Sequence, residues 1–560
     1  MKRISLLTVL VMLLHGAAAE PAGPDFRLPM DIPVALSANF GELRANHFHS
    51  GLDFKTQQVC GQKVYAVQDG YVSRIHISPY GYGNCLYIDH PSGYTTVYAH
   101  LERFLPFVDS IAKREQYARG SFAIDYYPPA GSLPVKKGQL IAYSGNSGGS
   151  GGPHLHFEIR ETDTQRALDP QQFYTLPDNV APRFKKIRLL PVAGEGAVRG
   201  QGLAQTYTVQ QREGGGYRLS RDTVEAWGKI GLEVKSYDYM PGQNNIYGVY
   251  HLRVEVDGLP VFEYRNDGFL FSETRMINAF IDYPAWYQHN DVYMRTFLLP
   301  GNRLPLFPQV EDDGYLTINE QRCYNVRLLA DDRQGNTSEL RFVIRGRKQL
   351  VPMVHVVTNA NKMYHDMPFR YANDDVELEI PAGALYEDAY FHYNVRRDSA
   401  GYSDIHQLLQ GTVPLQVAAT VRLRLQNDTL SDKRKYYIGR VGRKGGYDFV
   451  GNTYEDGFLS GSTRNLGSFR VLCDTVPPEV RLVSRGESVR VRIADKESGI
   501  ASYRGTVDGR WALFVYDAKN ASLQYKFDPQ RVQKGREHPV EITVMDQCGN
   551  VSTLSVMAYW

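Results

Sequence analysis

Five residues in three short clusters of this chain could together hold a metal ion and move protons beside it. They are His49 and Asp53 in His-Ser-Gly-Leu-Asp, His100 in Tyr-Ala-His-Leu, and His154 and His156 in Gly-Pro-His-Leu-His-Phe. A catalytic zinc ion takes three protein ligands, typically at about 2.0–2.2 Å for His and carboxylate, and keeps one position for water. The metal acidifies that water and polarises a carbonyl group. Spare imidazoles that titrate near neutral pH can move protons or hydrogen-bond an oxyanion.

A β-strand must present the pair His154 and His156. The run from His154 to Arg160 alternates polar and apolar residues, which is the period of a half-buried strand. Alternate side chains of a strand point to the same face, so both imidazoles are expected to face one cleft. His49, Asp53 and one member of the pair would then complete a set of three metal ligands.

Each cluster alone is weak evidence for a metal site. A His-x-His on a strand is more often structural than metal-binding, and a His-x-x-x-Asp spacing means little by itself. The three clusters nevertheless all fall between residues 49 and 156, and each lies beside glycine-rich backbone. His47 is predicted to support the ligands from behind or to be structural, and His90 to be solvated, so neither is expected to bind metal.

This stretch resembles peptidase family M23, the lysostaphin and LytM-like zinc endopeptidases that cut peptidoglycan cross-bridges. The resemblance spans roughly residues 35–175, and its motifs occur in the order of the family. These motifs are Arg44–Asp53, Val64–Gly70, Gly81–Asn84, Thr96–Leu101, Val135–Ile141, Ser144–Gly148 and Gly152–Glu158.

The resemblance implies a small antiparallel β-sheet domain and a role for each clustered residue. It implies that His49, Asp53 and His156 bind one zinc ion, Zn2+. It also implies that His100 and His154 are catalytic and flank the metal-bound water and the developing oxyanion. Some relatives have lost ligands and only activate other wall enzymes, but all five positions are intact here.

A competing motif is Gly145-Asn-Ser-Gly-Gly149, which fits the serine-hydrolase pattern G-x-S-x-G. That nucleophile elbow needs a strand before it and a helix after it. A strand can precede Ser147, but Gly-Gly-Pro and another predicted strand follow it. We therefore interpret this segment as a flexible loop that borders the cleft.

The segment from Glu102 to Pro134 departs from the family pattern, in which a few residues connect the flanking strands. It can form a helix over Ser110–Arg119 and adds aromatic and aliphatic residues. Long loops in compact domains are often lids or binding loops. We predict that this insertion, about 102–134, forms a wall of the cleft; the alternative is a packing insertion without function.

Length and charge suggest a multidomain exported protein. The chain has 560 residues and a formal net charge of +2 with charges spread throughout, which argues against a dedicated nucleic-acid-binding protein. Residues 1–19 read as a signal peptide, with Lys2 and Arg3 before an apolar run and Ala17–Ala19 at the cleavage site. No later apolar run approaches a membrane span. We expect secretion to the periplasm or cell envelope.

The number of cysteines is odd. Cys60 and Cys85 lie in the same predicted domain and could pair, as could Cys473 and Cys548, which would leave Cys323 over. Sequence alone does not establish connectivity, and all five could be reduced.

The rest of the chain reads as β-sandwich modules, because alternating runs are separated by Gly, Asn and Asp turns. Two frames repeat a pattern that resembles bacterial immunoglobulin-like (Ig-like) sandwiches. One opens at Asp178–Pro182 and closes at Asp332–Leu340; the other opens at Asp474–Pro478 and closes at Asp546–Leu554. The predicted domains are the peptidase at 20–175, an Ig-like domain at 176–348 with an insertion near 259–315, a β-sandwich at 349–473 and a C-terminal Ig-like domain at 474–560.

The sequence as a whole predicts a mainly β, secreted zinc metalloendopeptidase that hydrolyses peptide cross-links of peptidoglycan. Expected partners are peptidoglycan peptides and, through the β domains, other cell-envelope proteins; no nucleic acid is expected. Two alternatives remain open. One is a non-catalytic scaffold that binds the wall or activates an amidase, and the other is a secreted protease that acts on proteins.

Overall fold

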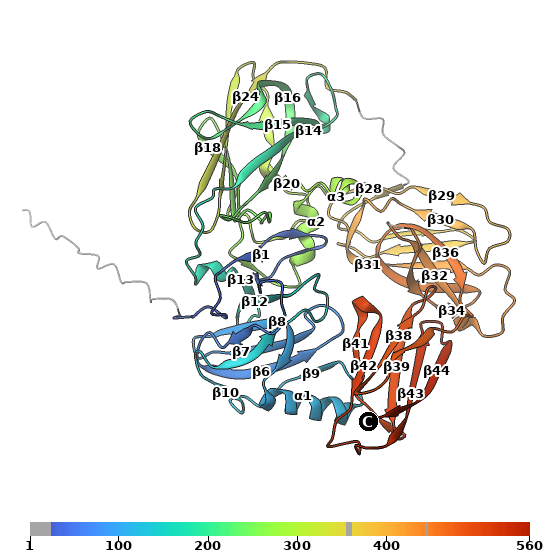
Figure 1. Ribbon diagram of the computed structural model, residues 1–560. Coiled ribbons are helices and arrows are strands. Elements are labelled where there is room, and N and C mark those ends of the chain that lie inside the picture. The colour runs from blue at the N-terminus through green and yellow to red at the C-terminus, as the bar shows by residue number, and fades with distance from the viewer. Residues whose placement is uncertain (1–23, 354–360, 444) are drawn as a thin grey trace, which may run out of the picture.

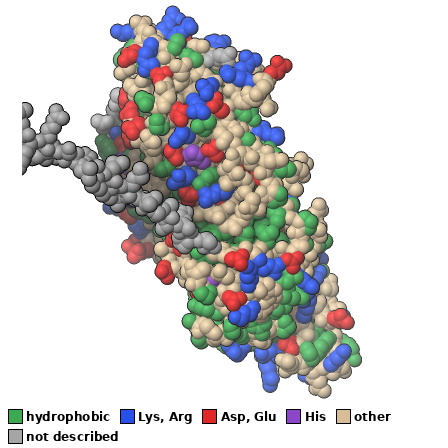
Figure 2. Space-filling model, turned by 90° about the vertical axis from the view of Figure 1, so that its left-hand side faces the viewer, with side chains coloured by type: hydrophobic (Ala, Val, Ile, Leu, Met, Phe, Trp, Pro, Cys, Tyr) green, Lys and Arg blue, Asp and Glu red, His purple; other side chains and the backbone are tan. Residues whose placement is uncertain are grey.

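The computed structural model describes residues 24–353, 361–443 and 445–560 and is built mainly from β-strands (Figure 1). The prediction of a mainly β fold is confirmed. The predicted signal peptide, residues 1–19, lies outside the described residues. Within the described ranges, no helix has the length and apolar character that a membrane crossing requires. Basic and acidic side chains are interspersed over the face drawn in Figure 2.

The first domain is built on a twelve-stranded sheet whose main path runs β1-β4-β12-β8-β7-β6-β10. Its strands are β1 (Leu36–Ala38), β4 (Leu52–Lys55), β5 (Lys63–Tyr65), β6 (Gly70–Ile77), β7 (Asn84–Asp89), β8 (Tyr94–Phe104), β9 (Ile124–Tyr126), β10 (Pro134–Val135), β11 (Leu140–Ser144), β12 (His154–Glu161), β13 (Ala167–Leu168) and β19 (Gly268–Phe269). A small hairpin, β2 (Leu43–Arg44) with β3 (His47–Phe48), and a 3-10 turn, η1 (Pro170–Gln172), complete the domain.

Strand β12 lies at the centre of this sheet, between β4 and β8. The predicted strand is therefore confirmed, but it is buried on both faces and not half-buried. Its register places His156 opposite Asp53 on β4 and opposite Ala99 on β8. Leu155 and Phe157 point away from the histidines into the hydrophobic core.

The second domain contains a ten-stranded sheet. Its strands are β14 (Arg183–Val198), β15 (Gln205–Gln211), β16 (Tyr217–Tyr237), β17 (His251–Val256), β18 (Leu259–Arg265), β20 (Met294–Arg295), β21 (Gln309–Val310), β22 (Leu316–Ile318), β23 (Cys323–Asp331) and β24 (Thr337–Gly346). The region predicted as an insertion also holds η2 (Thr274–Met276), α2 (Ile277–Phe280), α3 (Tyr283–His289) and η3 (Asp312–Gly314).

The first two domains share one hydrophobic core. Strand β19 belongs to the second domain by sequence, yet it pairs with β13 and so extends the first sheet. The buried apolar cluster continues without a break from Phe26 in the first domain to Ile344 in the second. Burial of apolar surface is the main favourable term in folding, so these two domains stabilise one another.

Two sandwiches form the rest of the chain, each with two sheets around its own core. One five-stranded sheet of the first sandwich consists, in order, of β26 (Phe369–Ala372), β27 (Val376–Ile380), β31 (Pro414–Arg424), β35 (Phe458–Asn465) and β34 (Thr453–Glu455). Its second five-stranded sheet consists of β29 (Tyr393–Arg396), β30 (Ile405–Leu408), β36 (Gly467–Cys473), β32 (Tyr436–Val441) and β33 (Tyr447–Gly451). The strand pair β25 (Lys362–Met363) and β28 (Ala389–Tyr390) and the turn η5 (Lys433–Lys435) complete this sandwich. One four-stranded sheet of the C-terminal sandwich consists, in order, of β37 (Glu479–Ser484), β38 (Ser488–Ala494), β42 (Ser522–Lys526) and β41 (Val515–Asp517). The other consists of β40 (Arg510–Trp511), β39 (Ile500–Val507), β43 (Glu537–Asp546) and β44 (Val551–Tyr559). The turn η6 (Ala518–Asn520) lies between β41 and β42 in the chain.

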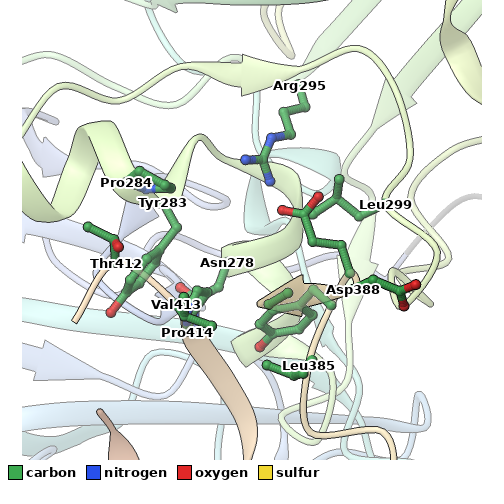
Figure 3. A pocket seen from close by; sticks show the side chains of 13 residues that line it. Asn278, Tyr283, Pro284, Arg295, Leu299, Leu385, Asp388, Thr412, Val413 and Pro414 are labelled. Carbon is green, nitrogen blue, oxygen red and sulfur yellow. The ribbon is translucent and has the colours of Figure 1, made fainter. Parts of the chain in front are cut away.

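A cavity of about 170 Å³ lies where α2 and α3 of the second domain meet the first sandwich (Figure 3). Arg295 and Tyr283 line it from the second domain, and Asp388 and Pro414 line it from the sandwich. A hydrogen bond also links the two domains here, since Arg275 Nε donates to the Leu415 carbonyl at 2.7 Å.

The insertion at 102–134 forms helix α1 (Pro106–Arg119) and strand β9. It packs against the C-terminal sandwich, where the Tyr117 ring meets Trp511 at a centroid distance of 5.0 Å and Arg531 at 3.3 Å. All five cysteines are within the described residues and all are free, so neither possible disulfide is formed.

Candidate metal centre

The structure brings His49, Asp53 and His156 together at the middle of the first sheet. Asp53 Oδ1 lies 3.0 Å from His49 Nε2 and 2.8 Å from His156 Nδ1, and the two nitrogens are 3.0 Å apart. All three residues are buried, with exposed fractions of 3%, 6% and 4%. Two imidazole nitrogens and one carboxylate oxygen that converge in this way form a donor set suited to zinc.

Hydrogen bonds on the far side of each ring decide which nitrogen faces this point. His49 Nδ1 donates to the Asn39 carbonyl at 2.6 Å, so its Nε2 offers a lone pair. His156 Nε2 donates to Glu158 Oε1 at 2.7 Å, so its Nδ1 offers one. Anchoring of this kind is what metal-binding histidines need, since it fixes both tautomer and ring orientation. Gly51 allows the close approach, because a Cβ there would clash with the Phe157 carbonyl.

Glu158 is the centre of a buried network that sequence reasoning missed. Its Oε1 accepts hydrogen bonds of 2.6 Å from Ser50 Oγ and from Tyr82 Oη, and its Oε2 accepts one of 2.6 Å from Arg160 Nε. Burial tends to raise the pKa of Glu158, but Arg160 and His156 outweigh it and hold the pKa below its usual range. The available signal was the His-x-Glu spacing, which places Glu158 on the same strand face as His156.

Electrostatics favour a cation at the point between the ligands. Burial tends to raise the pKa of Asp53, but His49 and His156 outweigh it and hold the pKa well below the usual value. Burial tends to lower the pKa of His156, but hydrogen bonds to Asp53 and Glu158 raise it to about 9. A divalent ion would compete with this proton, so metal binding is coupled to its release.

His100 and His154 lie beside the three ligand candidates, with ring centroids 4.6 Å apart. His100 Nδ1 donates to the Ser147 carbonyl and His154 Nδ1 to the Gly152 carbonyl, both at 2.9 Å. Each Nε2 is therefore left to face the site, and that of His154 lies 3.6 Å from Asp53 Oδ1. His100 also adopts a left-handed backbone conformation with φ of 57°, which non-glycine residues rarely hold outside constrained sites.

Burial lowers the pKa of His100 to about 3, with smaller contributions from His156 and His154. Its imidazole is therefore neutral at physiological pH. A neutral ring with an anchored Nδ1–H presents the lone pair of Nε2 to the site, where it can accept a hydrogen bond from water.

A hollow of about 270 Å³ opens beside His49, His100 and His156. Phe271 and Thr274 line it although they belong to the second domain, and Thr274 Oγ1 accepts a 2.8 Å hydrogen bond from the Phe48 amide. None of the described residues that line it belongs to the 102–134 insertion, so the prediction that this insertion forms the wall is wrong for this hollow. The lining residues are Arg44, His47, Phe48, His49, Ser50, Gly81, Tyr82, His100, Gly149, His156, Phe271 and Thr274.

The remaining candidates take structural roles. Ser147 Oγ donates to the Leu101 carbonyl at 2.8 Å and accepts from the Asn84 amide at 2.9 Å. Strand β12 follows it in place of a helix, so the segment lacks the context of a nucleophile elbow. His47 is exposed at the edge of the hollow. His90 is buried and not solvated as predicted, because both its ring nitrogens are hydrogen-bonded, to the Asp69 carbonyl and to Thr96.

Comparisons with known proteins agree with this geometry. The family model "Peptidase family M23" matches residues 47–118 and 132–170, and the interruption falls inside the insertion. A second family model, "Zu5-like domain", matches residues 360–474. Residues 47–118 and 132–170 of this chain are therefore similar to peptidase family M23.

Several relatives match over the same domain. An "Uncharacterized metalloprotease" of Haemophilus influenzae is 35% identical over 163 residues, which are 28% of this chain and 29% of the relative. "Peptidoglycan DD-endopeptidase ShyB" of Vibrio cholerae is 37% identical over 123 residues, or 21% of this chain and 23% of the relative. The match thus covers less than a third of these relatives. A solved "zinc containing peptidase from vibrio cholerae" is 31% identical over 28% of this chain and 41% of its own, with a TM-score of 0.21.

Proposed function

We propose that this protein is an exported zinc metalloendopeptidase that hydrolyses peptide cross-links of peptidoglycan. The observation that carries the proposal is the convergence of His49 Nε2, Asp53 Oδ1 and His156 Nδ1 on one buried point, with the opposite nitrogen of each ring anchored. The intact set of five residues favours an enzyme over a non-catalytic scaffold. Peptidoglycan as substrate is supported by the similarity to the Vibrio cholerae relative, which is named a peptidoglycan DD-endopeptidase.

Three side chains would hold the metal, and two would handle protons. His49, Asp53 and His156 would bind zinc, which when present would polarise the scissile carbonyl and acidify a water molecule. His100 accepts the proton of the attacking water on Nε2 and returns it to the leaving amine. His154 presents its Nε2 side to the developing oxyanion and helps to position it.

Digestion of purified cell-wall sacculi tests this proposal. We expect the protein to release uncross-linked muropeptides, detected by mass analysis, and to stop after a chelator removes its metal. Added zinc should restore activity to the wild type and not to His49→Ala. A zinc-loaded wild-type protein that cleaves no sacculus would overturn the enzymatic proposal, and cleavage that survives complete metal removal would overturn the role of zinc.

A further inference from the structure

Three aspartates meet at one end of the second domain, where the first repeated frame opens and closes. Asp178 precedes β14, Asp238 follows β16 and Asp332 follows β23. One carboxylate oxygen of each lies within 4.8 Å of the others. Asp238 and Asp332 are only 5% and 4% exposed. Like charges this close in a buried setting need a counter-charge or protonation.

The protein itself supplies no such counter-charge, and one oxygen of the cluster has no partner. Ion pairs between described residues include none of the three aspartates. Asp238 Oδ1 is fully buried and makes no hydrogen bond, although Asp332 is held by the amide and side chain of Asn336 at 2.9 and 2.6 Å. Burial and the nearby Asp332 and Asp178 raise the pKa of Asp238 to about 8, so a cation bound here would replace a proton. A buried carboxylate oxygen without a partner, in a cluster of carboxylates, is an unfilled ligand position for a cation.

The C-terminal sandwich contains an internal control for this cluster. It repeats the arrangement with Asp474, Asp495 and Asp546, again within 4.8 Å of one another. Here the protein supplies donors: Ser498 gives Asp474 Oδ2 two hydrogen bonds, from its amide at 3.1 Å and its hydroxyl at 2.5 Å. The amide of Gly499 donates to Asp495 at 2.7 Å.

One residue separates the two clusters chemically. The segment Asp238-Tyr-Met-Pro-Gly242 corresponds to Asp495-Lys-Glu-Ser-Gly499, so Pro241 stands where the other frame has Ser498. Proline has neither an amide hydrogen nor a hydroxyl group. The first cluster therefore keeps the same three carboxylates and lacks the two donors that satisfy the second.

We propose that Asp178, Asp238 and Asp332 bind a calcium ion. The three side chains can offer only oxygen ligands, which suit a hard cation such as calcium. Structural zinc prefers nitrogen and sulfur ligands, which this cluster does not contain. Calcium tolerates irregular geometry with six to eight oxygen ligands, and backbone carbonyls and water can supply the rest. Magnesium fits less well, because it demands a near-octahedral shell and gives up water reluctantly.

The position of the cluster connects it to the metal centre. The segment that leaves Asp238 runs onto the first domain, where Tyr247 Oη donates to the Leu36 carbonyl at 2.9 Å. Gly248 then exchanges two hydrogen bonds with the side chain of Asn39, at 2.8 and 2.9 Å. The carbonyl of Asn39 is the acceptor for His49. A calcium ion on Asp238 would fix the base of the segment that supports this ligand.

Calcium binding by the full-length, zinc-loaded protein tests the inference without reference to activity. Equilibrium dialysis from about 10⁻⁷ to 10⁻² M calcium covers the range of calcium sites in sensors and extracellular modules. We expect one ion per chain in the wild type, none in Asp238→Asn and one in the matched control Asp495→Asn. Asp238→Asn keeps the shape of the side chain but removes the group that can ionise, so the variant should still fold, which its melting temperature checks.

A second variant separates loss of calcium binding from loss of folding. Pro241→Ser restores the residue type of the C-terminal cluster, so it should weaken calcium binding by at least about tenfold while all three carboxylates remain. A wild type that binds no calcium would overturn the proposal, as would unchanged binding in Asp238→Asn. Loss of the ion in Asp495→Asn alone would assign it to the other cluster, and equal binding of magnesium would overturn the choice of calcium.

Discussion

The strands of the first domain and the segment from Gly268 to Phe280 border the same hollow in different ways. Strands β4, β8 and β12 with the His49 turn carry the five clustered residues His49, Asp53, His100, His154 and His156. The second segment belongs to another domain and contributes a wall through Phe271 and Thr274. The difference teaches that the chemistry of this site is local to one domain, whereas its shape depends on the contact between two.

The largest effects are expected from the strands. His100→Ala removes the neutral base, so turnover of a cross-linked muropeptide should fall by about 10²–10⁴-fold. Zinc content, measured by elemental analysis, should stay near one per chain, while His49→Ala, Asp53→Ala and His156→Ala should each lose the metal. Loss of zinc from His154→Ala with retention in His156→Ala would reverse the assignment within that pair.

The pH dependence of zinc binding gives the next largest effect. The pKa of His156 is raised to about 9 in the metal-free protein, so below that pH zinc has to displace a proton. Affinity should therefore rise by about tenfold per pH unit between pH 7 and 9 and level off above. Competition with a chromophoric chelator measures this slope, and a pH-independent affinity would contradict the proton-coupled site.

Removal of the carboxylate that hydrogen-bonds His156 should lower the affinity for zinc without changing the three candidate ligands. Glu158→Gln keeps the shape of the side chain but loses the carboxylate that accepts from His156 Nε2. Outer partners of metal-binding histidines typically contribute 10–100-fold to affinity, and we expect a zinc dissociation constant raised by about that factor. Glu161→Gln, on the same strand and partly exposed, is the matched control and should bind zinc like the wild type.

A substitution at Phe271, in the wall of the hollow, should lower kcat/KM for the substrate and leave zinc binding unchanged. Phe271→Ala removes an aromatic surface that is 40% exposed and stacked on Arg160 at 4.3 Å. We expect kcat/KM for a muropeptide to fall about tenfold, equivalent to roughly 1.4 kcal/mol, with unchanged zinc content. An unaltered kcat/KM in a folded variant would show that the second domain covers the hollow without binding substrate.

The smallest effect on catalysis is expected from the insertion. Tyr117→Ala removes the ring that contacts Trp511 and Arg531 of the C-terminal sandwich. Zinc content and kcat/KM should stay within about twofold of the wild type, since catalysis does not depend on this contact. Protease sensitivity of the boundary near residue 474 should rise instead, because the sandwich loses an anchor. A clear loss of kcat/KM would restore the insertion as part of the cleft.

The sequence pointed to the residues that converge at the candidate metal centre because histidine and aspartate recur over short spacings. A strand places His154 and His156 on one face whatever the rest of the fold does, and the resemblance to family M23 supplied their pairing with His49 and Asp53. Phe271 carries no such signal, since its place beside the hollow depends on packing between domains. Asn39 was hidden for the same reason: only its backbone carbonyl touches His49, and carbonyls are common to all residues.

The point at which the insertion leaves the chain did not predict which surface it packs on. Glu102–Pro134 leaves the strand that carries His100, which made a cleft wall a reasonable expectation. Tyr117 instead lies against Trp511 and Arg531 of the C-terminal sandwich, and Phe122 packs against the hydrophobic core of the first two domains. His90 was misjudged for a related reason: a polar residue near a strand end is usually solvated, but Thr96 and the Asp69 carbonyl satisfy it inside the protein.

The shared core of the first two domains has a consequence for how the chain is made. The cluster that contains Phe157 beside the metal ligands also contains Leu340 and Ile344, which are synthesised almost two hundred residues later. A nascent chain therefore cannot complete this core until the second domain has been translated. A gene fragment that stops at residue 175 should give an aggregation-prone product, and the smallest fragment worth expressing for the peptidase should extend through β24.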